Sequence, residues 1–180
     1  MNTSAPLRRA APDSPIEDDE RQMFISAMGK ACTGVTIVSA SGAHGSVGAT
    51  VSAMSSVSAD PPMLLVCIKR SNLVATAIEQ NRHFCVNLLA ARHRHLSQVF
   101  AGQAQASGGD RFADGDWRTS DCGAPVLSGA LATFECQVMK QIDLGSHTVY
   151  VGQVLRCSHQ DGAPLLYHHR QYCQPQALAN

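Results

Sequence analysis

Residues 45–62 have the sequence GSVGATVSAMSSVSADPP, in which two kinds of side chain alternate. The odd positions from Val47 to Val57 are mostly small and apolar, whereas the even positions are mostly glycine or hydroxyl residues. This period of two predicts a strand with one face in a core and the other lined with hydroxyls. The segment is long for one strand, so we expect a bend or bulge near Ser52–Ser55 before Asp60-Pro61-Pro62 ends it. Small residues on such a strand let a flat polar ligand approach the backbone closely.

The segments around this stretch predict further strands and three helices. Strands are expected at Val35–Ala40, Met63–Ile68, Phe84–Leu89, Leu131–Gln141, Thr148–Cys157 and Pro164–Tyr167, the first of which forms a hairpin with residues 45–62. The continuous apolar run Met63–Ile68 is expected to be buried on both faces. Helices are expected from Ser14 to about Gly34, from Ser71, as the N-cap, to Gln80 and from Arg92 to Ala101. Many strands, mostly short links and a few interrupting helices predict a mainly β (α+β) protein, an antiparallel barrel with peripheral helices.

The length and amino-acid composition of the chain limit the class of protein. A chain of 180 residues is most simply one domain, expected at 14–175 between a mobile tail at 1–13 and a short tail at 176–180. Lys plus Arg and Asp plus Glu both number 14, so there is no basic field to hold nucleic acid or an anionic membrane. No apolar run approaches the roughly 20 residues that cross a bilayer, and the first residues do not resemble a secretory signal.

Seven cysteines are spread along the chain without a CxxC pair. Their odd number and wide spacing argue against a disulfide framework and against a zinc site. We therefore expect reduced thiols, a cytoplasmic protein and no metal ion.

The sequence lacks the motifs of several common chemistries: GxGxxG after a strand, GxxxxGK[ST], GxSxG and HExxH. Two features remain. Lys69-Arg70-Ser71 places two cations between a strand end and a helix start, where a phosphate binds well, although a solvated basic turn has the same pattern. His147 follows Gly145 at a predicted hairpin tip, where a histidine either acts on a ligand or is simply exposed.

Three other clusters are open to more than one interpretation. Arg92–His95 is typical of a solvated helix face. His168-His169-Arg170 is a candidate for binding metal or substrate, but no third ligand is spaced to complete a metal site. Asp110-Arg111-Phe112 lies in the long loop Gly102–Pro125, either as part of a lid or as a surface anchor.

An ordered set of motifs covers most of the chain. It includes Cys32–Val38, Gly48-x-Thr50-x-Ser52-x-x-Ser55-Ser56-Val57-Ser58, Asp60-Pro61-Pro62, Phe84–Leu89, Asp110-Arg111-Phe112, Gly145-x-His147-Thr148, and Pro164–Tyr167 followed by Tyr172. This set resembles the flavin reductase family, which has the FMN-binding split β-barrel fold. The most similar members are small reductase components of two-component monooxygenases. The resemblance implies a homodimer that uses NADH or NADPH to reduce FMN or FAD, which a separate oxygenase then consumes.

The resemblance also implies which residues form the site. The flavin ring is expected against Ser46, Val47, Gly48, Ala49, Thr50, Ser52 and Ala53, with the hydroxyls of Thr50 and Ser52 at its polar edge. The ribityl and phosphate side is expected at Cys67, Ile68 and Lys69, and a further contact with the flavin at Val99 and Phe100. The nicotinamide is expected beside His147, Tyr167, His168, His169, Arg170 and Tyr172. Ser146 stands where relatives commonly carry an acidic residue.

In the implied reaction, hydride passes from the nicotinamide C4 to the flavin N5, so no covalent catalyst is needed. His147 is the candidate catalytic residue, which orients the nicotinamide or balances a proton. Two alternatives remain on the same fold. One is a pyridoxamine-phosphate-oxidase-like enzyme, and the other is a non-enzymatic carrier of flavin or haem.

Overall fold

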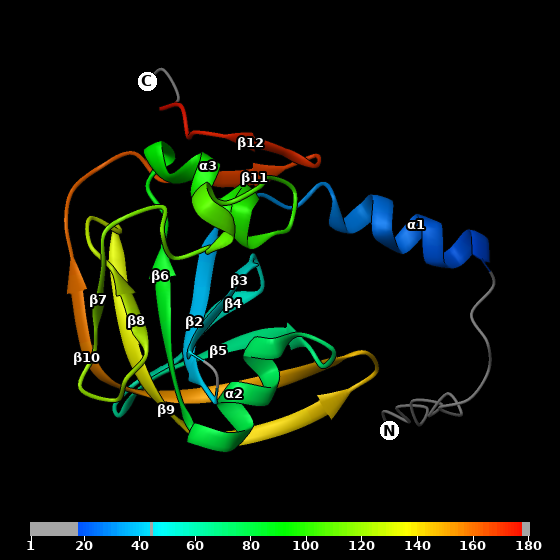
Figure 1. Cartoon of the computed structure of the whole chain (residues 1–180). Coiled ribbons are helices and arrows are strands. Elements are labelled where there is room, and N and C mark those ends of the chain that lie inside the picture. The colour runs from blue at the N-terminus through cyan, green and yellow to red at the C-terminus, as the bar shows by residue number, and fades with distance from the viewer. Residues whose placement is uncertain (1–17, 44, 178–180) are drawn as a thin grey trace, which may run out of the picture.

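The computed structural model of the chain describes residues 18–43 and 45–177 (Figure 1). The expected helix start at Ser14 and the expected tail at 1–13 lie outside the described residues. The helices are α1 (Asp18–Met28), α2 (Leu73–Asn81) and α3 (Arg94–Phe100), with short 3-10 turns at Ala91–His93 and Ser107–Gly109. The strands are β1 (Thr33–Gly34), β2 (Thr36–Gly42), β3 (Gly45–Val51), β4 (Met54–Ala59), β5 (Pro62–Lys69), β6 (His83–Leu88), β7 (Trp117–Thr119), β8 (Pro125–Leu127), β9 (Ala132–Leu144), β10 (His147–His159), β11 (Leu166–His168) and β12 (Gln171–Cys173).

Seven strands form the main sheet in the order β3-β2-β6-β9-β10-β5-β4, and every neighbouring pair is antiparallel. The two edge strands, β3 and β4, are consecutive in the chain and meet at the predicted bend, which lies at Ser52–Ala53. There the backbone N–H of Cys67 on β5 donates to the carbonyl of Ala53 at 3.1 Å. This bond connects the bend between the two edge strands to β5. The predicted class, mainly β with antiparallel strands and peripheral helices, is confirmed.

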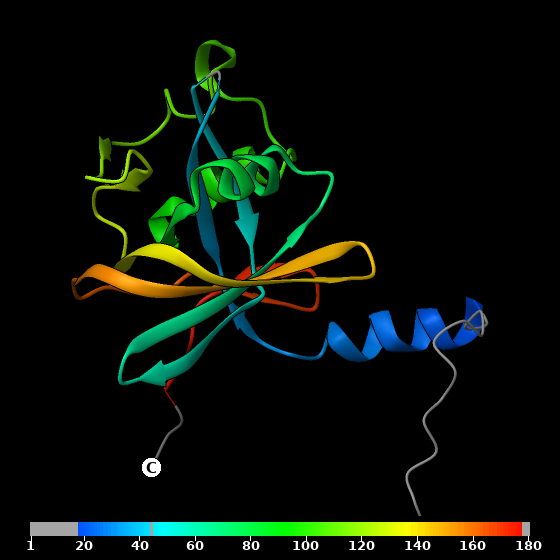
Figure 2. The same ribbon diagram turned by 90° about the horizontal axis from the view of Figure 1, so that it is seen from below.

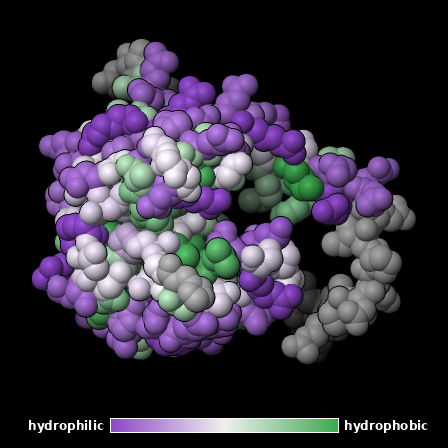
Figure 3. Space-filling view, viewed as in Figure 1, coloured by the Kyte–Doolittle hydropathy of each residue, from purple (hydrophilic) through white to green (hydrophobic). Residues whose placement is uncertain are grey.

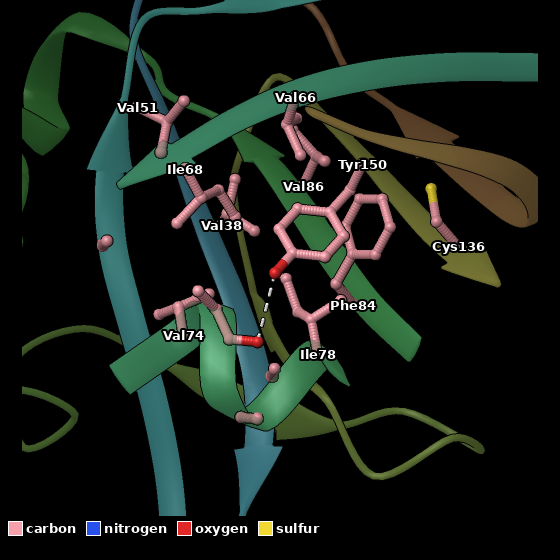
Figure 4. Close-up of a cluster of buried hydrophobic side chains, with 14 of the residues drawn as sticks. Val38, Val51, Val66, Ile68, Val74, Ile78, Phe84, Val86, Cys136 and Tyr150 are labelled. Carbon is pink, nitrogen blue, oxygen red and sulfur yellow. Dashed lines mark hydrogen bonds between the residues drawn. The ribbon is translucent and has the colours of Figure 1, made fainter. Parts of the chain in front are cut away.

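The core lies between the curled sheet and α2 (Figure 4). The fully buried ring of Tyr150 on β10 packs beside Phe84 of β6, and its hydroxyl donates to the carbonyl of Ala75 on α2 at 3.3 Å. Gly152 leaves room for this packing, because a Cβ there would lie 2.6 Å from the ring of Phe84 and 2.9 Å from the Cβ of Cys136. The sheet and α2 are therefore held by one tightly packed cluster.

Several local expectations were wrong. The first helix was expected to run to about Gly34, but α1 ends at Met28 and Thr33–Gly34 form β1. The strand at 63–68 was expected to be buried on both faces, but in β5 only Leu64, Val66 and Ile68 are buried, and the alternate side chains are half-buried. Among these half-buried side chains, Cys67 lines a cavity. The helix α2 was expected to be capped by Ser71, but its cap is Asn72, whose side-chain oxygen accepts from the N–H of Val74 at 3.0 Å.

The long loop after α3 is anchored by an aromatic cluster. Phe100 of α3, Phe112 of the loop and Trp117 of β7 lie with ring centroids 4.9–5.5 Å apart in edge or tilted arrangements. Such arrangements are favourable beyond the area they bury. Phe100 in turn covers β3, where a Cβ on Gly48 would lie only 2.5 Å from its ring. The loop is thereby fixed beside the strand at 45–51.

The C-terminal part forms a small separate sheet, β1-β11-β12. The last strand was expected at Pro164–Tyr167, but β11 begins two residues later and is followed by β12. The two strands are joined by His169 and Arg170, which both have positive φ, +48° and +60°. In Figure 1 this hairpin lies beside α3.

The helix α1 contributes no buried residue and projects from the body in both ribbon views (Figures 1 and 2). Its apolar stripe has the expected helical spacing, but Met23, Phe24 and Met28 are 72%, 65% and 57% exposed. The space-filling view shows apolar surface where this segment leaves the body (Figure 3). None of the described helices is long and apolar enough to span a membrane.

Candidate functional site

A groove runs along β3 in two adjoining cavities. The first, of about 520 Å³, is lined by Ser46–Gly48, Ser71–Leu73 and Gly109–Phe112. The second, of about 230 Å³, is lined by Ala49–Ala53, Cys67–Lys69, Asn72 and His147. Because Asn72 lines both cavities and the other residues follow one another along β3, we treat them as one feature, the β3 groove. Most of the residues expected to meet the flavin ring and its phosphate side lie here.

The sequence of β3 explains its two faces. Ala49 and Val51 are buried in the main core, as the alternating pattern predicts. The opposite face is more covered than expected, because Gly48 lies under Phe100 and the hydroxyl of Thr50 donates to the carbonyl of Ser97 at 2.7 Å. The proton of Thr50 is thus committed to α3, and its oxygen can only accept from a ligand. Ser52 is exposed and keeps its hydroxyl available.

β3 is an edge strand, so one side of its backbone has no strand partner. An unpaired strand edge presents N–H and C=O groups to a ligand. Gly48 and Ala49 line the groove although Phe100 covers Gly48 and the side chain of Ala49 packs in the core. A flat polar ring fits this arrangement.

The turn after β5 brings positive charge to the groove. Lys69 is exposed and lines it, and Arg111 lines it from the long loop. Within the described residues neither cation forms an ion pair. Arg70 does not line either cavity, but its backbone N–H donates to the carbonyl of Ser146 at 3.0 Å and ties the turn to the β9–β10 hairpin. The cations that face the groove are suited to a phosphate.

His147 enters the groove from the tip of the β9–β10 hairpin, opposite Lys69 in the β5–β10 register. Its Nδ1 lies 2.9 Å from the hydroxyl of Ser146, which leaves Nε2 for a ligand. Thr148 donates to the carboxylate of Asp143 at 2.7 Å across the same hairpin and holds the tip in shape.

The other predicted residues are placed elsewhere. Val99 and Phe100 are buried, and the ring of Phe100 covers Gly48, so neither side chain lines the groove. Tyr167, Arg170 and Tyr172 line a different cavity from His147, and His169 lines a surface pocket against α1. His168 packs edge-on against His169, with ring centroids 4.4 Å apart.

Several groove residues were not assigned to the site from the sequence. They are Val51, Ser71, Asn72, Leu73, Gly109, Asp110, Arg111 and Phe112. Ser71 had been noted as part of an anion site, and Asp110-Arg111-Phe112 was a motif without a settled role. No pattern pointed to Asn72, because its place in the groove follows from where α2 begins.

The buried thiols of Cys85 and Cys136 are expected to be unreactive. Burial raises the pKa of Cys136 to about 12 and raises the pKa of Cys85 well above its usual range. Thiols held in the protonated form are poor nucleophiles and poor metal ligands. Among the described residues, no three His, Cys, Asp or Glu side chains are grouped to hold a metal ion.

Comparisons with known proteins agree with this geometry. A family model described as the flavin reductase like domain matches residues 28–176. The FMN reductase (NADH) RutF of Acinetobacter baylyi is 41% identical over 161 residues, which cover 89% of this chain and 85% of that protein. The solved structure of the flavin reductase PheA2 has a TM-score of 0.80 at 31% identity and covers 90% of this chain and 100% of that chain. BorF, the flavin reductase component of a bacterial two-component tryptophan halogenase, has a TM-score of 0.75 at 29% identity and covers 86% of this chain and 97% of that chain.

The fold and the groove define an oxidoreductase that acts on flavin. The chain belongs to the flavin reductase family, which confirms the resemblance drawn from its motifs.

Proposed function

We propose that this chain is an NADH-dependent flavin reductase that reduces FMN or FAD in the β3 groove and supplies the reduced flavin to a separate oxygenase. The observation that carries the proposal is the groove itself. It combines an unpaired strand edge of small residues with cations at the adjoining loops and one histidine. The curated relative named an FMN reductase (NADH) favours FMN and NADH as the first pair to test.

Each part of the groove has a role in this proposal. The edge of β3 from Val47 to Ser52 binds the ring, with backbone N–H groups toward the side where negative charge develops. Lys69 and Arg111 bind the phosphate. His147 offers Nε2 to the nicotinamide and orients it. Bound flavin supplies the redox chemistry, because its N5 accepts hydride from the nicotinamide C4. The protein provides alignment and leaves the groove open enough for the product to depart.

The activity is tested by following flavin absorbance at about 450 nm after NADH or NADPH is added to the full chain with FMN, FAD or riboflavin. We expect bleaching that depends on enzyme, followed by reoxidation in air. No bleaching with any pair would exclude the reductase. A protein that instead purifies with tightly held FMN and consumes oxygen only with an amine substrate would favour the pyridoxamine-phosphate-oxidase-like alternative.

The role of His147 is tested by His147→Ala, with His159→Ala as the matched control at the far end of β10. We expect the KM for NADH to rise about tenfold while the Kd for FMN changes much less, because a lost hydrogen bond to one ligand affects that ligand alone. Equal losses for both ligands would contradict the assignment.

We also propose a homodimer in the cytoplasm. The homodimer is supported by the exposed apolar side chains of Met23, Phe24 and Met28 on α1, which a second copy of the chain would cover. Seven free cysteines support a reducing compartment. Sedimentation of Phe24→Glu, with Arg21→Glu as control, tests the assembly: only the first should shift the protein toward a monomer, and a monomeric wild type would exclude the dimer.

A further inference from the structure

The long loop between α3 and β7 is closed on itself by Asp114. The carboxylate Oδ2 of Asp114 accepts a hydrogen bond from the backbone N–H of Ser107 at 3.1 Å, and its main-chain carbonyl accepts from the indole N–H of Trp117 at 2.8 Å. The side chain of Asp114 is only 18% exposed, whereas Asp110 and Asp116 in the same loop are exposed. Asp114 lines neither cavity of the β3 groove, so its contacts are with the loop and not with the groove.

The segment that Asp114 closes carries every residue that this loop brings to the groove. Four consecutive residues, Gly109–Phe112, line the first cavity. They lie between Ser107 and Asp114, the two positions that the hydrogen bond joins. The cation among the four is Arg111. The place of Arg111 relative to β3 therefore depends on both ends of this segment.

The two sides of Arg111 are supported differently. On the C-terminal side, the ring of Phe112 packs against Phe100 with the centroids 4.9 Å apart. On the N-terminal side, Gly108 and Gly109 are exposed, have φ of +64° and +83°, and would have no atom within 4 Å of an added Cβ. Glycines lose more conformational entropy on ordering than other residues. The aromatic cluster thus supports only one side, and the bond from Ser107 to Asp114 supports the other.

The surroundings of Asp114 keep its carboxyl group charged. Hydrogen bonds from the hydroxyl and the N–H of Ser107 hold the pKa of Asp114 below its ordinary value, and His95 acts in the same direction. Nε2 of His95 on α3 lies 3.9 Å from Oδ2 of Asp114. A carboxylate is a stronger acceptor for a backbone N–H than a neutral group. The closing bond is therefore of the strong kind, and it lies beside α3.

Arg111 needs this kind of support to bind a ligand well. It is exposed, and within the described residues its guanidinium forms no ion pair. A long side chain on a glycine-containing segment loses conformational freedom when it binds a ligand, and that loss lowers the affinity. A segment that is already closed before binding loses less. The contribution of Arg111 to affinity should therefore depend on Asp114.

We propose that Asp114 is a positioning residue, which holds Arg111 at the β3 groove and thereby favours flavins that carry a phosphate. The binding of the phosphate by Arg111 rests on the proposed function. Asp114 does not line the groove, so its whole effect on the ligand passes through Arg111.

The experiment measures the Kd for FMN and for riboflavin by flavin fluorescence on the full chain. Arg111→Met should weaken FMN about tenfold and Asp114→Ala about fivefold, with riboflavin unchanged in both, because riboflavin has no phosphate. Asp114→Asn should keep most of the FMN affinity, since its amide oxygen can still accept from the N–H of Ser107. Asp116→Ala is the matched control in the same loop, because Asp116 is exposed and is bonded through its carbonyl, which accepts from Ser128 at 2.7 Å. It should leave both Kd values unchanged.

The double variant separates positioning from general damage to the groove. When Arg111 is already Met, Asp114→Ala should weaken FMN by less than about twofold, because the two changes remove one and the same contribution. A full fivefold loss in that background would overturn the proposal, as would equal losses for FMN and riboflavin in Asp114→Ala.

The reductase and the positioning role can fail separately. A chain in which Asp114→Ala weakens FMN through Arg111, but which bleaches no flavin with NADH or NADPH, would refute the reductase and keep the role of Asp114. An active reductase in which Asp114→Ala leaves the ratio of the FMN and riboflavin Kd values unchanged would refute the role of Asp114 alone.

Discussion

Gly152 and Gly48 occupy similar positions in two different regions of the molecule. Each lies in a strand beneath a phenylalanine ring, and an added Cβ would lie 2.6 Å from Phe84 in one case and 2.5 Å from Phe100 in the other. Around Gly152 everything is core: Phe84 and Tyr150 are fully buried, and α2 covers them. Around Gly48 the same close contact lies at the wall of the β3 groove, next to a loop that carries Arg111.

The same contact between a glycine and a phenylalanine ring has different consequences in the two regions. Close contact inside the sheet makes a frame that cannot adjust, because protein interiors are close-packed. Close contact at the sheet edge brings an aromatic ring against the backbone and shapes a ligand surface. Changes near Gly152 should therefore alter stability, and changes near Gly48 should alter flavin binding.

The largest effect is expected from Gly152→Ala. The new methyl must displace the ring of Phe84 or the backbone of β9, which costs about 3 kcal/mol of unfolding free energy by the usual penalty for overpacking. Urea unfolding measures this, and Gly152→Ala combined with Phe84→Leu should recover part of the loss. An unchanged unfolding midpoint would show that the core can adjust after all. The Kd for FMN, measured on folded protein, should stay within about twofold.

Tyr150 should make the core sensitive to alkali. Burial, followed by the nearby carboxylate of Glu79, raises the pKa of Tyr150 from 10.0 to about 12. The folded state therefore keeps a proton that the unfolded state loses above pH 10, so stability is complete below pH 10 and falls as the pH rises to about 12. The loss approaches about 3 kcal/mol, at about 1.4 kcal/mol per pKa unit.

Unfolding of Tyr150→Phe across this pH range is the check. The variant should show a flatter decline than the wild type. The raised pKa values of Cys85 and Cys136 contribute to the decline in both proteins, so only the difference between the two curves is due to Tyr150. Parallel curves would mean that the tyrosine does not control the alkaline behaviour.

Gly48→Ala should act on the groove. The methyl displaces Phe100 and Phe112, whose ring also lies within 3.3 Å of the built Cβ, and so shifts the wall of the first cavity. We expect the Kd for FMN to rise about tenfold, with a smaller loss of stability than for Gly152→Ala, because the loop can yield. Fluorescence titration of FMN measures the affinity. Gly48→Ala combined with Phe100→Leu should restore part of the affinity for FMN. An unaltered Kd in Gly48→Ala would mean that the position of Phe100 does not affect flavin binding.

The smallest effect is expected from Lys69→Ala. An exposed cation on a phosphate contributes modestly, so the Kd for FMN should rise about fivefold while that for riboflavin stays the same. Lys140→Ala, an exposed lysine on β9, is the control. Equal changes for FMN and riboflavin would mean that Lys69 does not bind the phosphate.

Local patterns predicted much of this fold. Alternation along residues 45–62 predicted the strands β3 and β4 and the bend between them, because a period of two and prolines act over a few residues. The expected core face was wrong in the second half, where Ala53 and Val57 are exposed. The ordered motifs predicted the family. The pairing of seven strands was not specified by any local pattern, since β5 meets β10 about eighty residues later in the chain.

The site was predicted less completely for the same reason. The residues predicted on Ser46–Ala53, which did not include Val51, and on Cys67–Lys69 line one groove, and their role toward flavin stays a prediction. Arg111 comes from a long loop whose position depends on an aromatic cluster. The hydroxyl of Thr50 donates to a carbonyl of α3, and no sequence spacing predicted that α3 packs against β3. Tyr167 and Tyr172 line a different cavity from His147, a relation that exists only in three dimensions.

The strand order also has a consequence for how the chain folds. The sheet consists of three hairpins, β2–β3, β4–β5 and β9–β10, with β6 among them. All three hairpins have two-residue links and close with little loss of chain entropy, whereas the joining of hairpins must close long loops. Among the three, β9–β10 pairs the most residues. We expect β9–β10 to form first and the other hairpins to add on either side. Pulsed hydrogen exchange should then protect the amides of β9–β10 before those of β2–β3, and the reverse order would exclude this route.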